Sequence, residues 1–274
     1  MSFDSICKDI KGVKIQGAES VAKAAVKALL LRHDKSAIKK LLSVRPTEPA
    51  LRNSVKYTTS HFNLKKAVEE VIDHFELNHK KINSFGSGII KNGMTIYTHC
   101  HSSTVIGILK EAKKQGKKFS VICTETRPLF QGRITASELA KAKIPVTLIV
   151  DSASRIALKK ADIMLLGADA ITSSKVYNKI GSELFATIAN KFEIPVYICT
   201  NSWKFENNPY EEIEERPSME IWPNAPKGVK IYNPAFEKID PKLVEAIISE
   251  LGILDFSSFL IQVKKTYPFI FEKF

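Results

Sequence analysis

The sequence predicts an α/β protein in which an N-terminal helical domain, residues 1–90, precedes a Rossmann-like domain with a parallel sheet, residues 91–274. Three observations support this fold class. Apolar residues recur at helical spacing through the first part of the chain. Beyond that part, short β-rich runs alternate with helical segments. The composition, 44% hydrophobic and 26% charged, is typical of a folded globular chain and excludes disordered and fibrous classes.

The first half of the chain is predicted to be helical from Val13 to about Ser84. Arg45–Pro49 interrupts the helical pattern, as proline does inside a helix. The stretch Asn83–Gly88 is interpreted as a linker or a tight helix end, so we expect the domain boundary near residue 90. The apolar positions that define the helical faces are Val21, Ala22, Ala25, Leu29, Leu64, Ala67, Val68, Val71, Ile72 and Phe75.

The second half is predicted to alternate strands with helices, which implies right-handed crossovers and a parallel sheet covered on both faces. The tail from Asn233 to Phe274 is predicted to form helices, and its aromatic side chains belong either to an interface or to the core. The predicted strands are Met94–His99, Phe119–Thr124, Val146–Val150, Asp162–Leu166 and Pro195–Thr200. The predicted helices are Ser103–Gln115, Thr135–Ala142, Ser152–Lys160 and Ile180–Phe192.

The chain is basic, with a formal net charge of +12, which favours phosphorylated or nucleic-acid partners. No arginine-rich run or nucleic-acid motif accompanies the charge, so a phosphorylated small molecule is the preferred partner and nucleic acid is not expected. No apolar run reaches the roughly 18 residues of a membrane span. The start of the chain lacks a signal-peptide layout, and the four cysteines lack CxxC spacing, so we expect a cytoplasmic protein without disulfides or structural zinc.

Polar residues follow each predicted strand, at the edge where open parallel sheets bind their ligands. These segments are Thr98–Ser103, Glu125–Pro128, Asp151–Ser152, Gly167–Asp169 and Thr200–Ser202, with Asn178 and Lys179 close behind. The sequence therefore predicts one crevice that holds a thiol, carboxylates and cations. The usual cofactor signatures are absent, because Gly86–Gly88 precedes the first strand and does not follow it. We expect neither a cofactor nor a metal, since His99 and His101 lack zinc-ligand spacing.

Each of these residues also has a purely structural interpretation. Cys100 fits as a small buried apolar residue, as Cys123 and Cys199 do. Asp169 can cap a helix or pair with Lys179. Asp151 either caps the next helix or binds a sugar hydroxyl. Arg127 either pairs with Glu125 or contacts phosphate, and the residues alone leave these alternatives open.

Seven motifs occur in order along the chain: Lys14–Ala18, Arg45–Thr47, Thr98–Ser102, Thr124–Pro128 with Gln131–Gly132, Gly167–Asp169, Asn178–Gly181 and Asn233–Phe236. Together they resemble the initiation factor 2B alpha/beta/delta superfamily, and within it the archaeal ribose-1,5-bisphosphate isomerases and the related methylthioribose-1-phosphate isomerases. The likeness covers nearly the whole chain. It departs from the isomerase pattern at Gln16, where an arginine is typical, and at Glu19, where a small residue is typical.

The resemblance implies that Cys100 and Asp169 carry out catalysis. It implies a sugar-phosphate site, and because the arginine is missing at Gln16, other cations must hold the phosphates. The expected substrate-binding residues are Gly17, Ala18, Arg45, Ser102, Arg127, Gln131, Asn178, Lys179 and Lys204.

Isomerisation of an aldose 1-phosphate requires an acid at the ring oxygen and a base at C2, because its anomeric oxygen is esterified. Cys100 can move a proton between C2 and C1 if His99, His101 or a nearby helix start raises its thiolate fraction. Asp169 can serve as the acid if apolar surroundings raise the pKa of its carboxyl group.

The function implied by the resemblance is conversion of ribose 1,5-bisphosphate to its ribulose form in nucleotide salvage. One alternative is a noncatalytic regulatory subunit that binds translation initiation factor 2, because the superfamily contains both kinds of protein. Another is a sensor that binds a nucleoside monophosphate, which is also a possible effector of the enzyme. The resemblance further implies a homo-oligomer, either a dimer or a hexamer.

Overall fold

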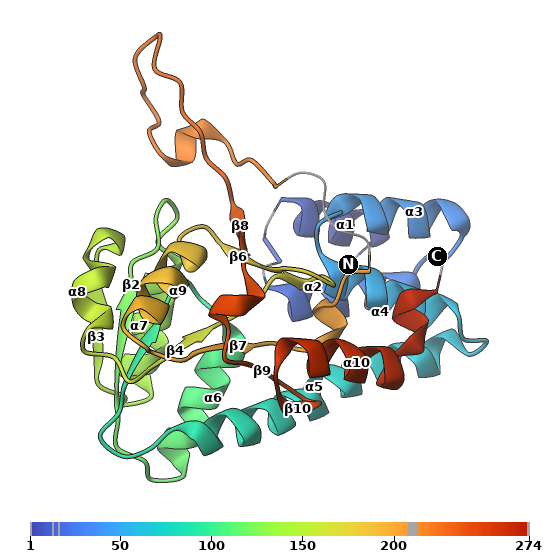
Figure 1. Ribbon diagram of the computed structural model, residues 1–274. Coiled ribbons are helices and arrows are strands. Elements are labelled where there is room, and N and C mark those ends of the chain that lie inside the picture. Colours follow the sequence, from blue (N-terminus) through green and yellow to red (C-terminus); the bar gives the residue numbers. More distant parts are fainter. Residues whose placement is uncertain (1, 13, 16, 208–212, 273–274) are drawn as a thin grey trace.

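The computed structural model describes residues 2–12, 14–15, 17–207 and 213–272. A bundle of helices at the N-terminus leads into a mainly parallel sheet with helices on both faces, as the sequence predicts (Figure 1). Gln16, one of the two positions that depart from the isomerase pattern, lies outside the described residues. The helices of the bundle are α1 (Phe3–Lys11), α2 (Ala18–Leu29), α3 (Lys35–Val44), α4 (Pro49–Thr59) and α5 (Leu64–Ile89).

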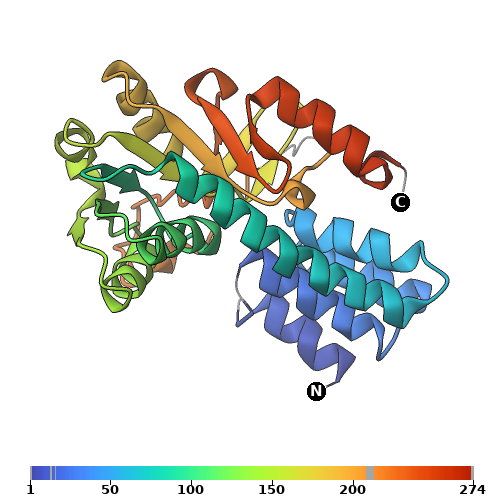
Figure 2. The same ribbon diagram turned by 90° about the horizontal axis from the view of Figure 1, so that it is seen from below.

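The long helix α5 joins the bundle to the sheet, and Figure 2 shows it running from one to the other. It begins where the side chain of Asn63 accepts a hydrogen bond from the Lys66 backbone N–H. The helix continues through Asn83–Gly88, so that stretch forms the last turns of a helix and the linker interpretation is wrong. Close packing explains the glycine at 86: a Cβ there would lie 2.5 Å from Cδ1 of Ile108 on the neighbouring helix.

The main sheet has seven strands in the order β10-β9-β7-β4-β1-β2-β3, and β10 alone runs antiparallel to its neighbour. All five predicted strands are present in it. Its strands are β1 (Thr95–Thr98), β2 (Ser120–Thr124), β3 (Val146–Ile149), β4 (Ile163–Leu166), β7 (Val196–Cys199), β9 (Ala246–Ser249) and β10 (Gly252–Leu254). The helices around it are α6 (Ser103–Lys114), α7 (Gln131–Lys141), α8 (Ser154–Leu158), α9 (Ser182–Lys191) and α10 (Phe256–Thr266).

Side chains alternate between the two faces of the sheet, and each face has its own core. On β4, Met164 and Leu166 belong to the core that includes Phe185 of α9, whereas Leu165 belongs to the core that includes Ile108 of α6. Strands that are buried on both faces read as continuous apolar runs, and β4 is an example.

The prediction that the tail is helical is wrong for residues 236–254. This part of the chain forms β8 (Phe236–Ile239), β9 and β10. The run Ala246–Ser249 is fully buried, and the periodicity of a short apolar run does not separate a buried strand from a buried helix. After β10, the terminal aromatic segment packs mostly against the core, where Phe259 is fully buried and Tyr267 partly so, although Ile261 remains exposed.

A second, antiparallel sheet, in the order β5-β6-β8, was not predicted. It consists of β5 (Ala170–Ile171), β6 (Val176–Lys179) and β8. This small sheet follows β4 directly and places Asn178 and Lys179 on strand β6, for which the sequence analysis predicted no element. Across the described parts of the chain, we find no helix of the length and apolar character that a membrane crossing requires.

Two glycines of α5 test how tightly this helix packs against α6. Replacing Gly88 with alanine, where a Cβ meets no atom within 4 Å, is expected to raise the free energy of unfolding by about 0.5–1 kcal/mol, because alanine favours the helix. Replacing Gly86 with alanine forces a collision with Ile108. Urea denaturation should therefore find Gly86→Ala less stable than Gly88→Ala by about 1–3 kcal/mol. Equal stabilities would show that the two helices separate easily.

Candidate active site

Two of the polar segments that follow strands, Thr98–Ser103 and Gly167–Asp169, contribute to the wall of one cavity of about 570 Å³. The segments Glu125–Pro128, Asp151–Ser152 and Thr200–Ser202 contribute no residue to the wall of this cavity. With the exception of Arg127, every predicted catalytic and substrate-binding residue lines it. The wall comes from both halves of the molecule: the start of α2 and the loop before α4 on one side, and the carboxyl edge of the sheet on the other. The residues predicted from the sequence that line it are Gly17, Ala18, Arg45, Cys100, Ser102, Gln131, Asp169, Asn178, Lys179 and Lys204.

Arg127 is the predicted substrate-binding residue that the structure does not bring to this cavity. Its side chain is exposed, and the guanidinium donates to the backbone carbonyls of Pro128 and Ile221. The expected ion pair of Arg127 with Glu125 does not form either, because the Glu125 carboxylate pairs with Arg133 at 3.0 Å. A motif fixes the position of a residue in the sequence but not the direction of its side chain, and the Arg127 side chain is exposed to solvent.

Cys100 follows β1 in a left-handed backbone conformation, with φ of 65°. This conformation is uncommon for a residue with a side chain, and two hydrogen bonds hold it. The Cys100 N–H donates to Thr126 Oγ1 at 3.0 Å, and its carbonyl accepts from Thr135 Oγ1 at 2.9 Å. The loop that carries the thiol is therefore fastened to the loop after β2 and to α7.

The two neighbouring histidines form their hydrogen bonds with groups other than the thiol. His99 uses both ring nitrogens: Nε2 donates to the Ile180 carbonyl at 2.9 Å, and Nδ1 meets Thr124 Oγ1. Burial lowers the pKa of His99 to about 4, so the ring is neutral. His101 contacts Thr135 Oγ1 at 3.1 Å, and burial lowers its pKa as well.

Burial raises the pKa of the Cys100 thiol to about 12, so the thiol is neutral in the free protein at physiological pH. The expectation that the ring of His99 or His101 raises its thiolate fraction is wrong, because the His99 ring is neutral and both rings form hydrogen bonds with other partners. The groups that favour the thiolate are the backbone N–H of His101 and the charge of Lys179.

Asp169 follows β4, and its N–H donates to the Tyr177 carbonyl of β6 at 2.8 Å. Burial raises the pKa of its carboxyl group, with Lys204, Arg45 and Lys179 opposing the rise. Within the described part of the chain, the carboxylate neither caps a helix nor lies within 4 Å of the Lys179 ammonium, so both structural interpretations fail. A protonated carboxyl group is what an acid catalyst requires.

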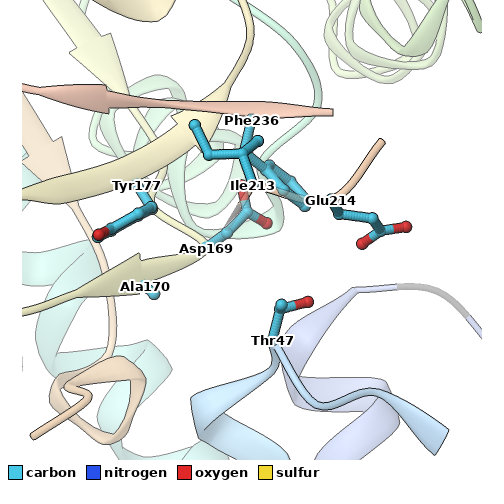
Figure 3. Close-up of a pocket in the computed structure, with 7 residues that line it drawn as sticks. All are labelled: Thr47, Asp169, Ala170, Tyr177, Ile213, Glu214 and Phe236. Atoms are coloured by element: carbon cyan, nitrogen blue, oxygen red, sulfur yellow. The ribbon is translucent and has the colours of Figure 1, made fainter. Parts of the chain in front are cut away.

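A second, small chamber of about 20 Å³ adjoins Asp169 on the side of the N-terminal bundle. Figure 3 shows the Asp169 carboxyl group there among the side chains of Thr47, Glu214 and Phe236. This volume suits about one water molecule. The carboxyl group thus stands between the larger cavity and a space too small for a substrate.

Cations gather around the same cavity. Lys179 is 7% exposed, and a lysine is seldom so buried unless an anion meets it. Lys204 donates to the Ala168 carbonyl at 2.6 Å from the 3-10 helix η2 (Ser202–Lys204). Arg45 lies at the end of α3. The helix α2 begins at Gly17 without a side-chain cap, which leaves backbone N–H groups at the cavity.

The remaining predicted residues hold the edges of the cavity in place. Ser102 caps α6, and a side chain at Gly167 would collide with its Oγ at 2.8 Å. Gln131 begins α7, and its Oε1 is buried without a partner among the described residues. Asn178 donates to Ser182 Oγ at 2.9 Å.

Two of the open questions from the sequence are answered by hydrogen bonds. The Asp151 carboxylate accepts from the backbone N–H groups of Thr126 and Arg127, so it clamps the loop after β2 and caps no helix. Glu19 pairs with His79 and Lys23, which link α2 to α5. Although burial opposes it, these two partners lower the pKa of Glu19 to about 2.

The sequence analysis missed a segment that closes one side of the cavity. Residues 213–235 project from the body of the molecule (Figure 1), and the base of this arm contributes Glu214, Arg216 and Glu220. Arg216 is already paired with both carboxylates, at 3.3 and 2.6 Å. Glu48, buried behind Arg45, was also missed. No local pattern marks these residues, because long-range packing alone brings them to the site.

The Thr126 hydroxyl can be tested as the anchor of the Cys100 loop. Thr126→Val keeps the shape of the side chain but leaves the Cys100 N–H without its acceptor, which should lower the free energy of unfolding by about 1–3 kcal/mol. Thr126→Ser keeps the hydroxyl and should lose less. Denaturant titration of both variants is the measurement, and equal stability of Thr126→Val and the wild type would contradict the anchor.

Comparisons with known proteins agree with this architecture. The family model described as the initiation factor 2 subunit family matches residues 13–256. The ribose 1,5-bisphosphate isomerase of Methanocaldococcus jannaschii is 38% identical over 273 residues, covering 89% of this chain and 89% of that protein. The ribose 1,5-bisphosphate isomerase of Thermococcus kodakarensis is 36% identical, covering 91% of this chain and 89% of that protein.

A solved structure shows the same fold. The crystal structure of the Pyrococcus horikoshii OT3 translation initiation factor eIF-2B is similar with a TM-score of 0.84 at 29% identity. The likeness covers 93% of this chain and 98% of that one. Since the family model spans most of the sequence and the two relatives align along nearly their whole length, the chain belongs to the initiation factor 2 subunit family.

Proposed function

We propose that the chain is an aldose–ketose isomerase that converts ribose 1,5-bisphosphate to ribulose 1,5-bisphosphate. The observation that carries the proposal is that Cys100 and Asp169 line one cavity together with Lys179, Lys204 and Arg45. The relatives at 38% and 36% identity, which are named ribose 1,5-bisphosphate isomerases, support it over the regulatory-subunit alternative.

The charge and size of the cavity suit a small bisphosphate. A volume of about 570 Å³ lies within the usual range for small-molecule sites. Lys179, Lys204 and Arg45 come from three different elements, so they can meet phosphate groups at separate positions. The uncapped start of α2 adds backbone N–H donors, which also favour anions.

In the proposed reaction, Asp169 gives its proton to the ring oxygen as the bond between that oxygen and C1 breaks. The Cys100 thiolate removes the proton from C2, and a C1–C2 double bond forms. The thiol then returns this proton to C1, while the 2-hydroxyl proton passes to the Asp169 carboxylate and leaves a C2 ketone. Both groups end in their starting states, and the hydrogens stay within the substrate and these two side chains, so the reaction needs no cofactor.

The ionic form required at the start is a thiolate beside a protonated carboxyl group. It differs from a thiol beside a carboxylate only by transfer of one proton from Cys100 to Asp169, so the two forms have the same net charge. Lys179 and the His101 N–H favour the thiolate form. Exclusion of water by the substrate strengthens both contacts.

Three further properties belong to the proposal. The cytoplasm is the proposed compartment, since the reduced cysteines, all four of which are unpaired, suit it. A homo-oligomer, either a dimer or a hexamer, and a nucleoside monophosphate effector stay predictions from the family resemblance. Sedimentation of the purified protein and calorimetry with nucleoside monophosphates are the respective measurements.

Removal of either catalytic group should abolish most of the turnover. We expect Cys100→Ser and Asp169→Asn each to lower kcat by about 10²–10⁴, because each removes one of the two proton-transfer groups. The assay measures formation of ribulose 1,5-bisphosphate from ribose 1,5-bisphosphate, with other pentose 1-phosphates in parallel.

Matched controls come from the same residue types outside the cavity. Cys7→Ser changes a buried thiol in the core of the N-terminal bundle, and Asp73→Asn changes an exposed carboxylate of α5. Both should turn over substrate near the wild-type rate. Full activity of Cys100→Ser would overturn the catalytic assignment. Absence of turnover by the wild type with every pentose phosphate, together with binding to translation initiation factor 2, would instead favour a regulatory subunit.

A further inference from the structure

Glu48 is a buried carboxyl group that no part of the proposed reaction uses. It occupies the N-cap position of α4 but makes no capping hydrogen bond, so the helix does not explain it. Its residue is 5% exposed. Oε2 lies 3.6 Å from Nη2 of Arg45, which itself lines the cavity. Glu48 Oε1 and Arg45 Nε are both buried without a partner among the described residues.

The charged groups that face Glu48 come from four separate elements. Arg45 ends α3 and Lys204 lies on η2, while Asp169 follows β4 and Glu214 lies at the base of the arm. The nearby Arg52 is engaged elsewhere, since it donates to the Glu206 carboxylate and to the Pro46 carbonyl. The two cations therefore lower the pKa of this buried acid, whereas the two other carboxyl groups raise it.

Burial is the dominant effect on this acid, and the charge of Asp169 adds to it. Together they raise the pKa of Glu48 to about 7, against the opposing charges of Lys204 and Arg45. An ionised carboxylate with one oxygen unpartnered is costly to bury, whereas the protonated form is tolerated. Near neutral pH, Glu48 therefore exchanges its proton.

We propose that Glu48 is a positioning residue that controls whether Arg45 is available to an anionic ligand group. The protonated side chain leaves the guanidinium free to bind a phosphate, and the ionised side chain holds the guanidinium and repels the phosphate. This role rests on the proposed function for its substrate, a sugar bisphosphate, and on the Arg45–Glu48 contact for its mechanism.

As a consequence, the dissociation constant of the sugar bisphosphate should rise with pH. If only the protonated form binds, the apparent dissociation constant is the intrinsic one divided by the protonated fraction. The apparent dissociation constant therefore nearly equals the intrinsic one at pH 6 and exceeds it about 10-fold at pH 8, because the pKa of Glu48 is about 7. Phosphate groups titrate too, but they affect wild-type and variant proteins alike, so the ratio of the two dissociation constants isolates Glu48.

The test compares Cys100→Ser with Cys100→Ser/Glu48→Gln, because the Cys100→Ser change slows conversion of the ligand during the titration. Calorimetry with ribulose 1,5-bisphosphate at pH 6 and pH 8 measures the two dissociation constants. We divide the dissociation constant of Cys100→Ser by that of Cys100→Ser/Glu48→Gln. This ratio should be near one at pH 6 and about 10 at pH 8, because the protein that retains Glu48 binds more weakly at the higher pH. Titration in buffers of different ionisation enthalpy should also show proton uptake on binding, which the Glu48→Gln change removes.

A matched control replaces Glu69, an exposed residue of α5, with glutamine, and should leave the ratio at one at both pH values. A ratio for Glu48→Gln that does not change with pH overturns the inference, as does unchanged proton uptake. Inorganic phosphate serves as a second probe, and binding of neither probe also overturns it, because no anion would then reach Arg45. Intact pH-dependent binding without turnover by the wild type counts against the proposed reaction alone.

Discussion

Parallel pairing of β1 with β4 is the contact on which the candidate site depends. Cys100 and Asp169 are far apart in the chain, yet the strands that precede them are neighbours in the sheet, with Thr98 opposite Leu165. Because the strands run in the same direction, the chain leaves both at one edge. The thiol and the carboxyl group therefore reach the same cavity, and a strand order that moved β1 away from β4 would separate them.

Burial at this edge sets the protonation of the site. Loss of water disfavours charged forms, so it raises the pKa of Cys100, Asp169 and Glu48 and lowers that of His99. The raised pKa values of these acids favour their neutral, protonated forms. The site thus has less negative charge than its count of carboxyl groups suggests, which suits an anionic substrate.

The N-terminal bundle completes the site and is fastened to the sheet domain by specific contacts. The Asn53 side chain on α4 donates to the carbonyls of Trp203 and Phe205, both at 2.8 Å. These carbonyls belong to the segment that carries Lys204, so one helix of the bundle positions a cation of the sheet domain. The division at residue 90 stays a prediction, because α5 packs against both α4 and α6.

Local patterns in the sequence were enough for the helices of the first half, the five alternating strands and the polar residues that follow them, including Asn178 and Lys179. Side-chain periodicity and the alternation of strands with helices along the chain are properties of residues close together in the sequence, so they are visible without the fold. The family resemblance added Arg45 and the catalytic roles of Cys100 and Asp169. The same patterns misled for Ala246–Ser249, since a fully buried strand lacks the alternation that would identify it.

Tertiary structure alone decided which side chains turn into the cavity. Arg127 lies in a motif and points outward, whereas Glu48 lacks any local signal and stands behind Arg45. The arm that brings Glu214 and the neutral state of the Cys100 thiol also depend on residues distant in the chain. Direction, burial and proximity arise when separate elements pack together, so the amino-acid order determined the elements and their chemistry, and packing determined the site.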